Sequence, residues 1–116
     1  VHVDSVEDWM ALEFGNQFAN PCCYGAYLMT NYVPIRNMIV PEGVDEIKNF
    51  TFFGLSQLTN VTIEGVIASI GNQAFRGCSR LKTMSFTSMS SNEVQQLDNY
   101  PFGIDLRITK IIFREE

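Results

Sequence analysis

Residues 44–63 read VDEIKNFTFFGLSQLTNVTI, and residues 67–86 read IASIGNQAFRGCSRLKTMSF. The second segment repeats the first at an offset of 23 residues. Six positions are identical in register: an isoleucine, an asparagine, a phenylalanine, a glycine, a serine and a leucine. A fixed period of this length is typical of stacked repeats, each of which buries its apolar face against its neighbours. The two segments therefore predict a repeat array.

The repeat continues in both directions, less perfectly. One period earlier, Ile35, Met38 and Val40 precede Leu58, Val61 and Ile63. After the second copy the offset lengthens to 27 residues. At that offset the matching residues are Val94, Leu97, Asn99, Phe102, Ile108, Ile111 and Phe113. The four extra residues fall in the polar stretch 87–93, whose composition is that of a surface loop. We expect two full repeats with an imperfect repeat at each end, because terminal units lack one neighbour.

The spacing within a repeat resembles that of a known family. Residues 58–63 follow Leu-x-x-Val-x-Ile, and residues 66–81 follow Val-Ile-x-x-Ile-Gly-x-x-Ala-Phe-x-x-Cys-x-x-Leu. This pattern resembles the leucine-rich repeat of BspA-like bacterial surface proteins. Residues 40–44 match its strand-exit turn, and residues 8–28 are similar to the helical segment that often precedes such arrays. The departures are Leu55 in place of Cys78, and Pro101 and Ile104 in place of Ala74 and Gly77.

The resemblance implies an α/β fold: a leucine-rich-repeat-like right-handed solenoid with a parallel strand ladder and an N-terminal capping helix. Residues 1–34 would form the helical cap and residues 35–116 the repeats, all in one domain. Alternation of apolar and polar residues places the strands near 37–40, 60–63, 83–86 and 110–113. The return path would carry Ile47, Ile70 and Leu97, followed by Phe52, Phe75 and Phe102 in a short helical turn.

The outward side chains of the predicted ladder are the candidate binding residues. They are Asn37, Ile39, Asn60, Thr62, Glu64, Thr83, Ser85, Thr87, Lys110 and Ile112, with Arg114 beyond them. Repeat proteins commonly bind on such a face because the ladder holds it rigid. Four strands would span about 15 Å, enough for a short peptide or a few sugar rings. The alternative is a face that is only solvated.

The N-terminal segment predicts a helix with one apolar stripe. It would start at Asp4 or Ser5, continue through Trp9, and end before Asn20 and Pro21. An aromatic ligand site around Trp9 is the alternative to a cap. Residues 24–33 are rich in aromatic and β-branched residues and predict a short strand or hairpin.

Two polar features of the sequence have both a structural and a functional interpretation. Asn49, Asn72 and Asn99 recur in the three return segments, either as a ligand ladder or, as we favour, bonded to loop backbone. A small acidic cluster, Glu42, Asp45 and Glu46, lacks the ligand spacing of a calcium loop and is expected to be solvated.

Residues for catalysis are scarce. The single histidine is His2, near the start of the sequence, and no glycine-rich phosphate loop is present. Three cysteines, Cys22, Cys23 and Cys78, fit neither a zinc site nor a disulfide framework. Cys78 is expected in the core, and a vicinal disulfide at 22–23 is the alternative to two thiols. We expect no metal and no cofactor.

Charge and family resemblance together define the functional hypotheses. The net charge is −5 and the basic residues are scattered, which argues against nucleic acid and membrane partners. The resemblance implies a non-enzymatic interaction or adhesion module, extracellular or on a bacterial cell surface. Its partner would be a protein or glycan on another cell or in the same surface assembly. The alternative is a structural spacer or capping domain without a ligand. An enzyme, the third class, has no supporting residue.

Overall fold

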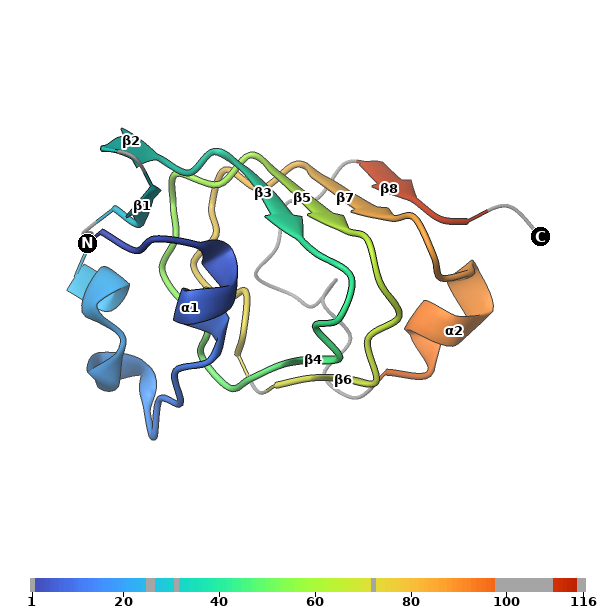
Figure 1. Cartoon of the computed structure of the whole chain (residues 1–116), viewed down its shortest axis with the longest axis horizontal. Coiled ribbons are helices and arrows are strands. Elements are labelled where there is room, and N and C mark those ends of the chain that lie inside the picture. Colours follow the sequence, from blue (N-terminus) through green and yellow to red (C-terminus); the bar gives the residue numbers. More distant parts are fainter. Residues whose placement is uncertain (1, 25–26, 31, 72, 98–109, 115–116) are drawn as a thin grey trace.

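A parallel sheet of four strands forms one side of the molecule in the computed structural model, which describes residues 2–24, 27–30, 32–71, 73–97 and 110–114. The strands are β3 (Asn37–Val40), β5 (Asn60–Ile63), β7 (Thr83–Phe86) and β8 (Lys110–Ile112), in that spatial order (Figure 1). Asn60 pairs with Asn37 and with Thr83, and Thr83 pairs with Lys110. These pairings reproduce the sequence offsets of 23, 23 and 27 residues, so the predicted ladder is confirmed.

The inward side chains of the ladder form the core with the residues behind it. In β3, β5 and β7, every second side chain is buried. The buried strand residues are Met38, Val40, Val61, Ile63, Met84 and Phe86. Leu58 and Leu81, two residues before their strands, are fully buried as well. The alternation read from the sequence therefore gives the correct face of each strand.

The return path contains a second, smaller parallel sheet. β4 (Glu46–Ile47) pairs with β6 (Ser69–Ile70). Figure 1 shows these strands on the side of the molecule away from the ladder. Ile47 and Ile70 are buried, as predicted. Leu97, the predicted third member, lies just after a helix, and it is packed against the core.

The predicted helical turn around Phe52 and Phe75 is wrong. Residues 49–54 and 73–77 are turns in which Phe50 and Gln73, one period apart, have φ of 60° and 53°. Gly54 and Gly77 also share a left-handed φ, of 77° and 84°. A left-handed residue near each end of these short segments prevents a right-handed helix. Phe102, Asn72 and Asn99 lie outside the described residues.

Successive turns are joined by backbone hydrogen bonds. The N–H of Phe52 donates to Ala74 (2.8 Å) and that of Gly54 donates to Arg76 (2.8 Å). The rings of Phe52 and Phe75 have centroids 5.3 Å apart and fill the space behind the ladder. The turns therefore stack in the same register as the strands.

The N-terminal helix is much shorter than predicted. α1 spans Val6–Met10, and the Ser5 side chain accepts the N–H of Asp8 (3.2 Å) as its N-cap. Two short 3₁₀ turns follow, η1 (Gln17–Ala19) and η2 (Pro21–Tyr24). The Asn16 side chain accepts the N–H groups of Phe18 (2.9 Å) and Ala19 (3.1 Å), which starts a new turn instead of continuing the helix.

The N-terminal segment is bonded to the first turn of the repeats. Trp9 is 1% exposed, and its indole N–H donates to the carbonyl of Thr51 (2.7 Å). The amide of the buried Asn20 donates to the carbonyl of Phe50 (2.7 Å). These side chains satisfy carbonyl groups at the end of the array, where no preceding repeat is available to do so.

The hairpin expected within residues 24–33 is present at the end of that stretch. β1 (Met29–Thr30) and β2 (Val33–Pro34) pair in antiparallel fashion directly before the ladder begins.

The predicted polar loop at 87–93 is only partly correct, because a helix starts within it. α2 spans Ser91–Gln95, and Ser90 and Glu93 form a reciprocal capping box. Val94 is buried on this helix. The Ser-x-x-Glu spacing before an apolar residue was a readable helix signal.

Gly71 provides a test of the stacked return path. A Cβ at this position would lie 2.3 Å from the backbone nitrogen of Asn49 in the preceding repeat. Gly71→Ala should therefore lower the free energy of unfolding by roughly 3 kcal/mol or more, measured by urea denaturation. Gly15→Ala is the control, because a Cβ there meets nothing within 4 Å. Equal stability of Gly71→Ala and wild type would contradict the stacking.

Candidate functional site

The outward side chains of the ladder form one surface, which we call the ladder face. Its residues fall into columns set by strand register. The first column is Asn37, Asn60, Thr83 and Lys110, and the second is Ile39, Thr62, Ser85 and Ile112. Glu64 and Thr87 follow one residue beyond β5 and β7. The structure thus brings together the residues predicted from the sequence, although their role as ligand contacts stays a prediction.

The ladder face is rigid because its backing is packed. Met38, Val61 and Met84 point inward between the two columns and are at most 1% exposed. A closely packed core of this kind resists displacement of the strands it supports. The polar side chains above it are therefore held at fixed spacing along the sheet.

Side chains of the first column are linked across the strands. The Asn60 amide donates to Oδ1 of Asn37 (2.5 Å). Beside this column, just before β5, the Thr59 hydroxyl donates to the backbone carbonyl of Arg36 (3.2 Å). An amide pair of this kind has donor and acceptor capacity left for a ligand. Thr62, Thr83 and Ser85 add half-exposed hydroxyls to the same surface.

At the edge of the ladder face where the strands end, the side chains form hydrogen bonds within the protein that the sequence did not indicate. The Thr87 hydroxyl donates to the carbonyls of Ile63 (3.4 Å) and Glu64 (3.3 Å), and that of Ser88 donates to Glu64 (2.6 Å). These bonds hold the turn after β7 against the turn after β5. Thr87 therefore has a structural function in addition to its predicted role in binding.

Arg114, just beyond the ladder face, forms an ion pair with a residue of α2. Nη2 of Arg114 lies 2.8 Å from Oε1 of Glu93, and Nη1 donates to the carbonyl of Ser88 (3.1 Å). Hydrogen bonds from the Ser90 backbone and hydroxyl, and then the Arg114 charge, lower the pKa of Glu93. The carboxylate is therefore ionised at neutral pH.

Exposed apolar side chains, Ile39 and Ile112, lie at the two edges of the face.

The described residues offer no cluster of metal-binding side chains. Among them, no group of three or more His, Cys, Asp or Glu side chains is placed to hold a metal ion. This includes the acidic residues of 42–46. Nor does the described part of the chain contain a helix of the length and apolarity needed to cross a bilayer.

Cys78 is a core residue, as predicted. It is fully buried, and its Sγ donates to the carbonyl of Phe52 (3.2 Å). Burial raises the pKa of the thiol to about 12, partly offset by a backbone hydrogen bond from Leu55. A thiol in this state is not a nucleophile at neutral pH. Cys22 is buried too.

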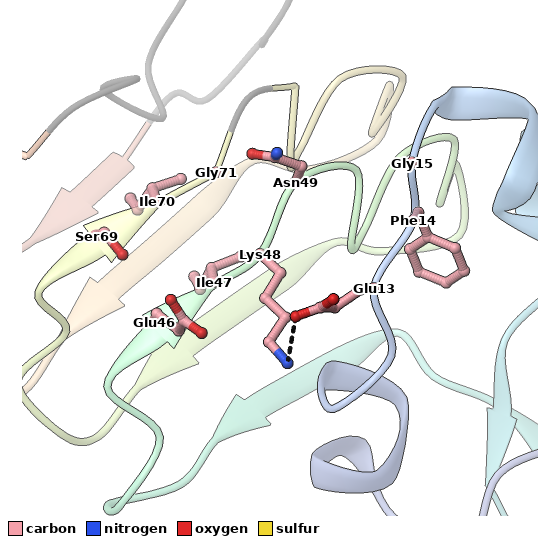
Figure 2. A pocket seen from close by; sticks show the side chains of 10 residues that line it. All are labelled: Glu13, Phe14, Gly15, Glu46, Ile47, Lys48, Asn49, Ser69, Ile70 and Gly71. Carbon is pink, nitrogen blue, oxygen red and sulfur yellow. Dashed lines mark ion pairs between the residues drawn. The ribbon is translucent and has the colours of Figure 1, made fainter.

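A groove on the return path was not found from the sequence. It has a volume of about 670 Å³ and lies between the segment after α1 and the small sheet of β4 and β6 (Figure 2). Its lining comes from residues 13–15, 46–49 and 69–71. These segments are far apart in the sequence, so no local pattern indicates that they meet.

One comparison with known proteins gives a match. A family model described as "BspA type Leucine rich repeat region (6 copies)" matches residues 25–116. The match covers the hairpin and the whole ladder, and it excludes α1. Neither the curated proteins nor the solved structures contain a significant match to this chain.

The Cys78 thiol gives a test of core burial. At pH 7.5, iodoacetamide should modify Cys78 only as fast as the protein unfolds, because a pKa near 12 leaves roughly a thousandfold less thiolate than a pKa of 9. Peptide mapping by mass spectrometry measures the rate at this residue. Between pH 9 and pH 12 the Cys78 thiol is ionised in the unfolded chain and still protonated in the folded chain, so the free energy of unfolding falls as pH rises through this range. Equal labelling rates with and without urea would contradict burial.

Proposed function

The chain belongs to the BspA-type leucine-rich repeat family, and from this premise we propose that it is a non-enzymatic interaction module that binds its partner through the ladder face. Repeats of this family suggest protein interaction or adhesion, and leucine-rich repeats are typically not enzymes. The observation that carries the proposal is the ladder face itself. It is a continuous surface of amides and hydroxyls above packed apolar side chains.

The proposed partner is a protein or glycan with many hydrogen-bonding groups. Asn37, Asn60, Thr83 and Ser85 offer both donors and acceptors at the spacing of the strands, about 4.8 Å. A face only about 15 Å wide gives modest affinity alone. We therefore propose that it acts in multivalent contacts, in which linked modules raise the effective concentration of one another.

The proposed location is outside a bacterial cell, either on its surface or secreted. The family is known for bacterial surface proteins, and this is the support for the location. Partners would then be displayed on another cell or in the same surface assembly.

The proposed architecture is a right-handed solenoid in which residues 1–34 cap residues 35–116. Crossovers between parallel strands are almost always right-handed, which supports the handedness. The bonds from Trp9 and Asn20 to the first turn support a capping role.

A spacer or capping domain without a ligand is the second candidate. The Asn60–Asn37 bond and the two Thr87 bonds favour it, because they satisfy polar groups of the face within the protein. Such bonds stabilise a ladder whether or not a partner is present.

One experiment distinguishes the two candidate functions. Replacing Asn60, Thr62, Thr83 and Ser85 together with alanine should leave the fold nearly unchanged, at roughly 0.5 kcal/mol or less per site. It should abolish attachment to any partner found by glycan array or by pull-down with the wild-type protein. The control variant replaces the exposed polar residues Glu7, Ser79, Asn92 and Gln96 with alanine.

Circular dichroism should show that both variants are folded before binding is compared. Loss of binding in the ladder variant alone supports the ladder face. Equal binding by the ladder variant and the wild type would contradict it.

A further inference from the structure

One edge of β4 has no neighbouring strand among the described residues. The small sheet consists of β4 and β6 only. On the β6 side, the carbonyl of Asp45 accepts the N–H of Ala68 (2.6 Å), and that of Ile47 accepts the N–H of Gly71 (2.5 Å). Backbone groups of successive strand residues point to opposite edges, so the N–H and C=O of Glu46 point away from β6. An open edge of this kind is a template for another strand.

This open edge borders the groove of about 670 Å³. The opposite wall is the segment Glu13–Gly15, and Figure 2 shows the Lys48 side chain extending between that wall and β4. Nζ of Lys48 donates to the carbonyl of Ala11 (3.1 Å) and lies 3.9 Å from Oε1 of Glu13. Within the described residues, no backbone hydrogen bond joins residues 12–15 to residues 46–48. The wall is thus held near β4 by a side chain and does not pair with its edge.

The lining of the groove carries a net negative charge, because it has two carboxylates and one ammonium group. Glu13 and Glu46 line the groove, and the Glu13 side chain is 84% exposed. Lys48 is the one cation of the lining. Charge complementarity therefore favours an occupant with positive side chains.

We propose that the groove binds an extended peptide segment of a partner protein, rich in lysine or arginine, as an additional strand on the free edge of β4. The backbone of the peptide bonds to the N–H and C=O of Glu46, and its basic side chains contact Glu13 and Glu46. Strand addition of this type takes affinity from backbone bonds and specificity from side chains. The strands β4 and β6, which line the groove, lie on the side of the molecule away from the ladder (Figure 1), so the groove is a second site, separate from the ladder face.

The first experiment measures the binding of three fluorescently labelled hexapeptides to the wild-type protein by fluorescence anisotropy. The first alternates valine and lysine and should bind saturably. The second has glutamate in place of lysine, and the third keeps lysine but is N-methylated at alternate backbone nitrogens. Each should bind at least about tenfold more weakly, because one loses the charge complement and the other the backbone donors.

Variants of the protein then locate the site. Glu46→Pro removes the outward N–H, a substitution that an edge strand tolerates, and should weaken binding of the valine–lysine peptide about tenfold. Glu46→Gln, which keeps the backbone, should weaken it less. The fourfold ladder-face variant should bind as the wild type does. Thermal melts establish that each variant is folded.

Three results would overturn the proposal. The first is absence of saturable binding by the valine–lysine peptide. The second is equal affinity of the methylated and unmethylated peptides, which would mean that the peptide binds by charge alone, without backbone hydrogen bonds to β4. The third is self-association of the protein that Glu46→Pro abolishes, which would make the occupant a second copy of this chain.

Discussion

Parallel pairing of Val61 with Met38 on one side and Met84 on the other is the contact on which the rest of the structure depends. Side chains alternate between the two sheet faces, so a shift of one residue in this register would turn the buried column outward. The same register positions Phe52 over Phe75 and Gly71 against the preceding repeat. Core, return path and ladder face are therefore consequences of one pairing.

The ladder could be predicted from the sequence because two periodicities agree there. The alternation within residues 60–63 gives the buried face, and the 23-residue offset gives the partner of each strand. The N-terminal helix could not be predicted in the same way. Its apolar stripe extends past Met10, yet α1 ends at that residue, and the Asn16 side chain accepts the N–H groups of Phe18 and Ala19 in a separate turn. The turns at Phe50 and Gln73 depend on left-handed backbone that neither residue type favours, and their stacked neighbours hold it there.

The residues of the candidate site and their outward orientation could be predicted from the sequence, but the hydrogen bonds and ion pairs between them could not. Outward orientation of Asn37 and Asn60 follows from the strand pattern, but the bond between them depends on the distance between neighbouring strands. The pairing of Arg114 with Glu93 required α2, whose capping signal at Ser90 lay in a stretch interpreted as a loop. The groove beside β4 is formed by segments distant in sequence, so only the three-dimensional arrangement shows it.

Measuring the strand register in solution tests the structure most directly. Interstrand nuclear Overhauser effects between backbone protons of β5 and its two neighbours would measure it in an isotope-labelled sample. We expect contacts that follow a parallel pattern, with Val61 opposite Met38 and Met84. An antiparallel pattern, or a parallel pattern displaced by one residue, would contradict the account, because Asn60 and Thr62 would then no longer share one outward face with Thr83 and Ser85.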